Sequence, residues 1–418
     1  MVMKRMKHRC GILLLLGCCG AQAAALEPLQ GGWGHPPTTY NLLPGAQRPD
    51  GSRTMPVFAP LPPYHDTTVR QVVRLSAATR GIALRLDNAF GAGALKIGAV
   101  HVALAGDNGG IVPGSDHTVS FSGRRAADIP PGAALLSDPI DWALPAFARL
   151  SVSVYYPDET VPPAHTLFAL QAWQAGGDHT ADTALPAPVP ARSGNHLSQI
   201  DIVPQKAGST LVTFGDSITE GVASTVGGFH GWPDVLAERL QANAATRGWS
   251  VVNAGIGSNR LLHDTPSTNA LSRFDRDVLA VPGVKAVLVL LGINDIQYSH
   301  RNPGEAVSAD DQIAALAQLI ARAHAAGLRI YGGTITPFAD TSDYTPQGEA
   351  ARQAVNSFIR SGAFDGVADF DAALRDPAAP SRLRADLASR GNLHPNDAGY
   401  KAMGDAVPLA LFSGGSRH

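Results

Sequence analysis

Hydrophobic and polar residues alternate with a period of two through much of the first half of the chain. The alternation is clearest in four segments, separated by clusters of Gly, Pro, Asn and Asp: residues 69–75, 82–88, 96–104 and 149–156. Such alternation is typical of strands with one buried face. Because no helical periodicity lies between these short strands, the pattern predicts an antiparallel all-β sandwich, jelly-roll-like in type.

A stretch rich in Ala, Pro and Gly follows at residues 174–195. Its composition fits either an interdomain linker or a long surface loop, and composition alone does not separate the two. Residues 200–204 have the pattern of one more strand, which would return to the sandwich. We therefore expect an N-terminal β-sandwich domain over residues 24–205, with 174–195 included.

The hydrophobic pattern changes after residue 205, where continuous apolar runs alternate with segments of helical periodicity. The runs lie at 210–217, 250–255, 285–295, 328–337 and 365–371. The clearest helix spans 308–327, where Ser308 and Asp311 predict a capping box and Gly327 a C-cap. Strands that alternate with helices predict a parallel sheet with helices on both faces, and hence an α/β domain over residues 206–418.

The first 23 residues have the features of an export signal. Positively charged residues precede a short apolar stretch at 11–17, and Ala21-Gln22-Ala23 offers a small-residue cleavage site. The apolar stretch is far shorter than the ~20 residues of a membrane-spanning helix. We therefore expect residues 1–23 to be a signal peptide and the protein to be periplasmic or secreted, with no integral membrane span.

All three cysteines, Cys10, Cys18 and Cys19, lie in this segment. Cleavage after Ala23 would leave a chain without disulfides, thiol nucleophiles or thiolate metal ligands. The motif LLGC that ends at Cys18 also resembles a bacterial lipoprotein box. A lipid anchor on Cys18 therefore stays open as the alternative to soluble export.

The composition narrows the class of protein further. Hydrophobic residues make up 44% of the 418 residues and charged residues only 16%, so the chain can bury a sizeable core. The formal net charge of −2 argues against a nucleic-acid partner, which usually requires a basic surplus. The sequence does not decide the oligomeric state.

Candidate catalytic side chains follow several predicted strands of the α/β domain. Ser217 comes directly after the first strand, a turn with Gly257 and Ser258 follows the second, Asn294 follows the third, and His394 precedes the last helix. By itself, a serine at a strand-to-helix junction is more often a simple N-cap. The carboxyl ends of parallel strands meet at one edge of a sheet, however, so a nucleophile, oxyanion donors and a base would lie together there.

Three sequence blocks resemble the GDSL family of serine hydrolases, also called SGNH hydrolases. The blocks are FGDSITEG, GIND and HPNDAGY, and the resemblance covers residues 209–408. It implies a flavodoxin-like three-layer α/β/α domain with Ser217 as nucleophile and His394 as general base. The implied oxyanion donors are the Ser217 N–H, an N–H of the Gly257–Ser258 turn and the Asn294 amide. The N-terminal region resembles, more loosely, the accessory sandwich of some bacterial members.

The resemblance implies neither an organic cofactor nor a metal ion. In agreement, His263, His300 and His324 are scattered, and no pair of them has a metal-ligand spacing such as H-E-x-x-H. Residues 227–233 could line the mouth of the pocket, or Trp232 within them could pack in the core.

This sequence departs from the family pattern at two positions. Ser258 stands where the family usually has glycine, which matters little unless the turn demands a positive φ. Gly391 stands where the family has the aspartate that orients the base histidine. A different carboxylate such as Asp386 could support His394, a backbone carbonyl could do so and leave a serine–histidine dyad, or catalysis could be weak. Asp397 is expected to cap the following helix instead.

Acyl transfer requires residue types of this kind. A serine hydroxyl needs a base to take its proton, and the charge that develops on the carbonyl oxygen needs preorganised donors. The sequence therefore favours a serine esterase for small acyl esters or acylated carbohydrate, which forms an acyl-enzyme on Ser217. The alternative is a weak or inactive relative that acts as an exported glycan-binding module.

Overall fold

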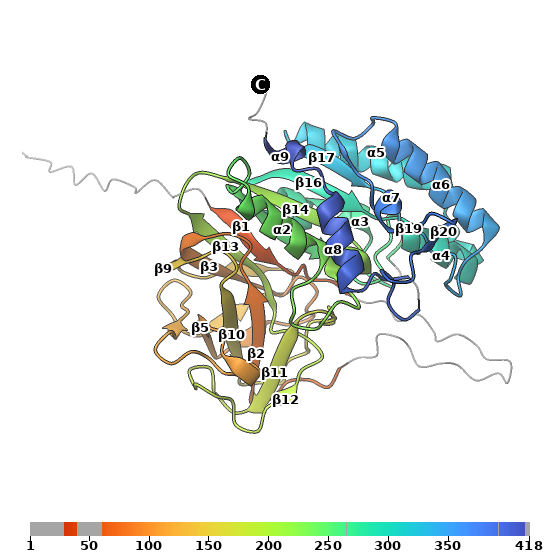
Figure 1. Cartoon of the computed structure of the whole chain (residues 1–418). Helices are drawn as coiled ribbons and strands as arrows, with labels where there is room; N and C mark the ends of the chain where they lie inside the picture. The colour runs from red at the N-terminus through yellow and green to blue at the C-terminus, as the bar shows by residue number, and fades with distance from the viewer. Residues whose placement is uncertain (1–28, 40–60, 265, 392, 414–418) are drawn as a thin grey trace, which may run out of the picture.

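The structure is a computed structural model that describes residues 29–39, 61–264, 266–391 and 393–413. The expected export signal and its cysteines lie outside these residues. A sheet-rich N-terminal part packs against an α/β part (Figure 1). None of the helices in the described ranges combines the length and apolar character needed to cross a membrane.

The N-terminal part contains two antiparallel sheets. The first has the order β1-β13-β3-β8, with β9 also paired to β3: β1 (Gln30–Gly34), β13 (Leu197–Pro204), β3 (Thr79–Asp87), β8 (Ala134–Leu136) and β9 (Ile140–Leu144). The second has the order β12-β11-β2-β10-β5-β6: β12 (Val189–Pro190), β11 (Gln171–Gly176), β2 (Thr67–Arg74), β10 (Arg149–Tyr156), β5 (Ala99–Leu104) and β6 (His117–Thr118). A separate pair joins β4 (Leu95–Ile97) to β7 (Ala127–Ile129).

The four predicted strand segments are confirmed, with one difference. The segment 96–104 is split at Gly98, because β4 pairs with β7 whereas β5 pairs with β10. The Ala/Pro/Gly-rich stretch contains the end of β11 and all of β12, which pair with each other, so it is a surface hairpin of the second sheet. Residues 200–204 lie in β13, as predicted. The core between the sheets is mainly aliphatic, with fully buried side chains such as Val69, Ile82 and Val152.

The C-terminal part is built on a parallel sheet of order β15-β14-β16-β17-β18. Its strands are β14 (Ser209–Gly215), β15 (Trp249–Gly255), β16 (Val284–Leu290), β17 (Arg329–Gly333) and β18 (Val367–Ala368). In chain order this is 2-1-3-4-5, so the strand order reverses around β14. In open α/β sheets ligands bind outside the carboxyl ends of the strands at such a reversal.

Nine α-helices are found in the described part of the chain: α1 (Ser217–Glu220), α2 (Trp232–Ala242), α3 (Ala270–Phe274), α4 (Ile293–Arg301), α5 (Ala309–Ala325), α6 (Pro346–Arg360), α7 (Phe370–Leu374), α8 (Asp397–Ala406) and α9 (Ala410–Ser413). A small hairpin, β19 (Arg375–Asp376) with β20 (Ala379–Leu383), follows α7. In α5 the capping box of Ser308 and Asp311 is confirmed. The helix is capped at its other end by Ala326, and Gly327 follows with a φ of 71°.

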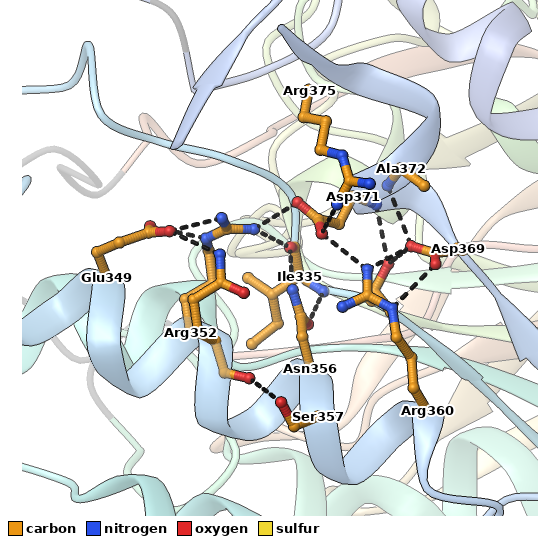
Figure 2. Close-up of polar contacts among 12 residues, drawn as sticks. Ile335, Glu349, Arg352, Asn356, Ser357, Arg360, Asp369, Asp371, Ala372 and Arg375 are labelled. Atoms are coloured by element: carbon orange, nitrogen blue, oxygen red, sulfur yellow. Dashed lines mark hydrogen bonds and ion pairs between the residues drawn. The ribbon is translucent and has the colours of Figure 1, made fainter. Parts of the chain in front are cut away.

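A buried ion-pair network holds α6 and α7 to the segment after β17 (Figure 2). The fully buried guanidinium of Arg352 donates to Asp371 at 2.7 Å and to the Ile335 carbonyl at 3.0 Å. Asn356 also bonds both backbone groups of Ile335, at 2.7 and 2.9 Å. Arg360 adds bonds to Asp369 and Asp371. The network satisfies polar groups that would otherwise be buried unpaired.

The two parts meet along β1, which packs against β15 at the edge of the parallel sheet. Close approach depends on glycine, since a Cβ on Gly31 or Gly34 would lie 2.5 Å from a methyl group of Val252. Hydrogen bonds also cross the junction: Gly31 N donates to Thr210 Oγ1 at 3.1 Å, and Val251 N to Ser76 Oγ at 2.9 Å. The contact is therefore specific and tightly packed.

Candidate active site

Ser217 lies at the carboxyl end of β14, at the first position of α1. Asp216 caps this helix, because its carboxylate accepts a hydrogen bond from Ile218 N at 2.9 Å. The turn requires glycine at 215, where a Cβ would lie 2.0 Å from Thr219 Oγ1. Ser217 itself is 8% exposed, so its hydroxyl group is nearly enclosed at the edge of the sheet.

The imidazole of His394 lies against this hydroxyl group, with Nε2 2.8 Å from Ser217 Oγ. The loop that carries His394 is fixed by Asn396, which caps α8 through Gly399 N at 3.0 Å and donates to the Ala388 carbonyl at 3.1 Å. Ser389 N also donates to the His394 carbonyl at 2.9 Å. The predicted nucleophile and base, 177 residues apart, are thus brought together.

The helix cap predicted for Asp397 is wrong, because Asn396 occupies that position. The Asp397 carboxylate accepts bonds from the amide and hydroxyl of Thr225, at 2.8 and 2.6 Å, and pairs with His230 at 2.7 Å. It therefore ties α8 to the loop after α1.

No carboxylate in the described ranges is hydrogen-bonded to His394 Nδ1. The Asp386 carboxylate pairs with Arg384 at 2.6 Å and is mostly exposed. Gly391 has a φ of 92°, and a Cβ there would meet nothing within 4 Å. Burial lowers the pKa of His394 to about 4. The imidazole is consequently neutral at physiological pH, which is the form that accepts a proton.

Asn294 and the turn at 257–259 form the candidate oxyanion region. Asn294 is in the first turn of α4, is 4% exposed, and donates one amide proton to the Asn259 carbonyl at 3.1 Å. A side-chain amide has two protons, so the other is left for a ligand. Gly257 is buried, while Ser258 has a φ of 58°. The turn does demand the left-handed conformation that suits the family's glycine.

Arg273 is a positioning residue that the sequence did not reveal. Its guanidinium is fully buried and donates to the Gly215 carbonyl at 2.8 Å, the Ala254 carbonyl at 2.9 Å and Asn259 Oδ1 at 2.9 Å. It also pairs with Asp277 at 3.1 Å. Burial lowers the pKa of Arg273 to about 10, which leaves it charged. It thus holds the ends of β14 and β15 together with the oxyanion turn.

Two buried carboxyl groups stabilise loops around the site. Asp295 accepts from Leu261 N at 2.9 Å, and burial raises the pKa of Asp295 to about 6. Burial also raises the pKa of Asp216 to about 7. Trp232, on α2, is fully buried in the core, which was one of the two predictions for this residue. Phe229 and His230, just before it, line a cavity near the domain junction.

This fold, with Ser217 and His394 in contact at the carboxyl edge of the sheet, is that of a hydrolase. The sequence model of the GDSL-like Lipase/Acylhydrolase family matches residues 213–402, and the α/β part of the chain belongs to that family. No curated protein matches the chain significantly.

Several solved structures are similar to about half of the chain. One is a protein assigned to the G-D-S-L family of lipolytic proteins from Desulfitobacterium hafniense, with 24% identity and a TM-score of 0.38, over 48% of this chain and 97% of that one. A GDSL-like lipase from Bacteroides thetaiotaomicron has 18% identity and a TM-score of 0.37, over 49% of this chain and 87% of that one. A variant acetyl xylan esterase from Geobacillus stearothermophilus has 23% identity and a TM-score of 0.38, over 49% of this chain and 95% of that one.

Proposed function

We propose that this protein is an exported serine esterase that uses Ser217 as nucleophile and His394 as general base. The observation that carries the proposal is the 2.8 Å contact between His394 Nε2 and Ser217 Oγ at the carboxyl edge of the parallel sheet. A base within hydrogen-bond distance is what a serine hydroxyl needs to become a nucleophile. The neutral state of the buried imidazole supports the same role.

In the proposed reaction, Ser217 Oγ attacks the ester carbonyl carbon while His394 Nε2 takes the hydroxyl proton. The oxyanion accepts hydrogen bonds from the Ser217 N–H, the Gly257–Ser258 turn and the free proton of the Asn294 amide. When the tetrahedral intermediate collapses, the imidazolium protonates the leaving alcohol and an acyl-enzyme remains. His394 then activates water, which attacks the acyl group, releases the acid and returns the proton to Ser217.

We propose that the pair works as a dyad, without a carboxylate behind the histidine. In serine proteases the loss of the aspartate's charge lowers kcat by about 10⁴-fold, because the imidazole then takes the wrong tautomer. Here backbone and Asn396 hydrogen bonds hold the loop that carries His394, and the contact with Ser217 Oγ orients the ring.

The substrates that we propose are small acyl esters or acylated carbohydrates. Expected export and the sandwich beside the catalytic part favour substrates outside the cytoplasm, in soluble form or with the protein anchored at Cys18. We propose the domain boundaries given above, a jelly-roll-like type for the sandwich, and a flavodoxin-like α/β/α layering that the 2-1-3-4-5 strand order supports.

The test is hydrolysis of p-nitrophenyl acetate by the wild-type protein beside Ser217→Ala, with Ser272→Ala, a change on the exposed first turn of α3, as a matched control. We expect the wild type and the control to hydrolyse the ester at equal rates and Ser217→Ala to fall to background. Equal rates for all three proteins, with unchanged circular dichroism, would reject catalysis and favour the glycan-binding alternative.

A further inference from the structure

Two histidines and a glutamate from distant parts of the sequence meet where the two domains join. His35 follows β1, His165 lies in the loop between β10 and β11, and Glu220 is the last residue of α1, three positions after Ser217. One potential ligand atom from each lies within 4.8 Å of those of the other two. The side chains of His165 and Glu220 are only 2% and 6% exposed.

The polar atoms of this cluster are buried without partners. His35 Nε2, His165 Nε2 and both carboxylate oxygens of Glu220 make no hydrogen bond of ordinary geometry to any residue that the structure describes. Buried polar groups in native proteins are almost always paired, so each exception requires an ion, a water molecule or a proton to explain it. Three of these residues' ligand atoms, one from each, lie within 4.8 Å of one another, so a single cation among them would account for the unpaired acceptors.

The tautomer of His165 strengthens this conclusion. His165 Nδ1 lies 2.8 Å from the Pro36 carbonyl, to which only an N–H can donate. A neutral ring with its proton on Nδ1 has a lone pair on Nε2, and the Nε2 atom lies 3.4 Å from Glu220 Oε1. Two acceptors therefore face each other. A histidine whose outer nitrogen donates to a carbonyl is the usual arrangement of a metal ligand.

The separation between these two acceptors suits a metal ion. A direct N–H···O bond would be about 2.7–3.2 Å long. Two ligands bound at about 2.0–2.2 Å in a tetrahedron lie about 3.3–3.6 Å apart. The observed separation of 3.4 Å between His165 Nε2 and Glu220 Oε1 is that of two metal ligands and is longer than a direct hydrogen bond.

We propose that His35, His165 and Glu220 form a site for a divalent transition-metal ion, Zn²⁺ above all, at the junction of the two domains. Two imidazoles and one carboxylate are an established ligand set for Zn²⁺, whereas Mg²⁺ and Ca²⁺ prefer oxygen ligands. A cavity of about 70 Å³ lined by His35 and Glu220 provides room for water as a fourth ligand. The two imidazole rings stack at 3.7 Å, so binding requires one of them to turn until both Nε2 atoms converge.

The position of the site indicates what the ion does. Two ligands come from the sandwich side of the junction, and the third ends the helix that begins with Ser217. A shared ion would therefore connect the N-terminal part to the segment that carries the nucleophile. It takes no part in the proposed acyl transfer, and the inference does not rest on esterase activity.

The rival explanation is a protonated Glu220 beside two neutral histidines. Burial raises the pKa of Glu220 well above its usual range, opposed only in part by the nearby Gly257 N–H. Burial also lowers the pKa of His165 to about 4 and that of His35 well below its usual value. In this explanation the cluster is uncharged without a cation, and Zn²⁺ would bind only weakly because it would have to displace the proton of Glu220.

The experiment measures metal binding directly on the full chain without a histidine tag. The three cysteines are alkylated first, so that thiolates do not bind the ion; all of them precede the described residues. After dialysis against a chelator, Zn²⁺ is titrated in competition with a chromophoric chelator, and Co²⁺ is added to a second sample for its absorption spectrum. The variants are Glu220→Gln and His165→Gln. The control is His324→Gln, an exposed histidine on α5.

We expect the wild type and His324→Gln to bind about one Zn²⁺ per chain, to give a tetrahedral Co²⁺ spectrum, and to unfold at a higher temperature with Zn²⁺ than without it. Each ligand variant should bind Zn²⁺ ~100-fold more weakly or worse. Circular dichroism of the metal-free proteins verifies that the variants fold. Failure of the metal-free wild type to bind Zn²⁺, or equal affinity in the folded ligand variants, would overturn the proposal. Either result is independent of ester hydrolysis.

Discussion

His394 Nε2 lies 2.8 Å from Ser217 Oγ, and nothing charged holds the other side of the imidazole ring within the described residues. In a triad the buried aspartate stabilises the imidazolium and raises the basicity of the ring. Here burial acts alone and in the opposite direction, since it lowers the pKa of His394 to about 4. The proposed base is therefore weak but always available at neutral pH.

This arrangement predicts an unusual pH dependence. The base works only when unprotonated, so kcat/KM for p-nitrophenyl acetate should stay flat as pH falls from 8 to about 5 and should decline only near the pKa of about 4. A profile that declines near pH 6.5, where an ordinary histidine titrates, would show that His394 is not desolvated.

The same pKa shift affects stability. Between about pH 6.5 and 4 the unfolded chain binds a proton at His394 that the folded chain excludes, so the contribution of this residue to the free energy of unfolding is complete above pH 6.5 and is lost as pH falls towards 4. Urea denaturation at several pH values measures this loss. The variant His394→Gln should show a shallower decline than the wild type.

Substitutions of Gly391 test whether an aspartate at this position would raise the rate of ester hydrolysis. Its φ of 92° disfavours any side chain, so both Gly391→Asp and Gly391→Asn should lose about 1 kcal/mol of stability. A Cβ at this position meets nothing within 4 Å, so we expect the new carboxylate to extend into solvent and the two variants to hydrolyse p-nitrophenyl acetate at the same rate. The asparagine variant controls for the backbone strain. A rate at least tenfold higher for the aspartate variant would contradict this and would indicate a restored triad.

The elements and residues that sequence predicted are those whose signals are local. Strand alternation located β2, β3 and β10, and the capping box of Ser308 and Asp311 located the start of α5. Ser217, His394 and Asn294 each stand in a short block directly after a strand or before a helix. Parallel topology then brings such positions to one edge, so the structure could be expected to place Ser217 and His394 together.

The features that sequence missed depend on long-range packing. Arg273 is in an ordinary-looking helical segment, and only the fold shows that it reaches the carbonyls of two strands. His35, His165 and Glu220 have no spacing that marks a metal site, because the domain junction brings them together. The sequence also could not show whether Asn396 or Asp397 caps α8. Asp397 instead bonds Thr225 and His230, and only the fold brings these residues close to it.

Arg273 should be essential to the geometry of the site. Arg273→Met removes a buried charge that pairs with Asp277 and takes away the side-chain donor to the Gly215 and Ala254 carbonyls, which should destabilise the protein by about 3–5 kcal/mol. Arg273→Lys keeps the charge but cannot reach all the acceptors, so it should fold and lose kcat while KM stays nearly constant. Urea denaturation and steady-state kinetics measure the two effects. As a control, Arg384→Met removes an exposed pair and should change little; equal behaviour of both arginines would refute the positioning role.

Asn294 should contribute to the transition state and not to binding. Its amide donates one proton to the Asn259 carbonyl at 3.1 Å and has a second to offer, and Asn294 follows β16 at the same edge of the sheet as Ser217. Removal of one oxyanion donor typically lowers kcat by about 10²–10³-fold, so we expect Asn294→Ala to show that loss with an almost unchanged KM. Asn302→Ala, at the other end of α4, controls for damage to the helix. A rise in KM with normal kcat would instead assign Asn294 to substrate binding, and unchanged kinetics would exclude it from the oxyanion hole.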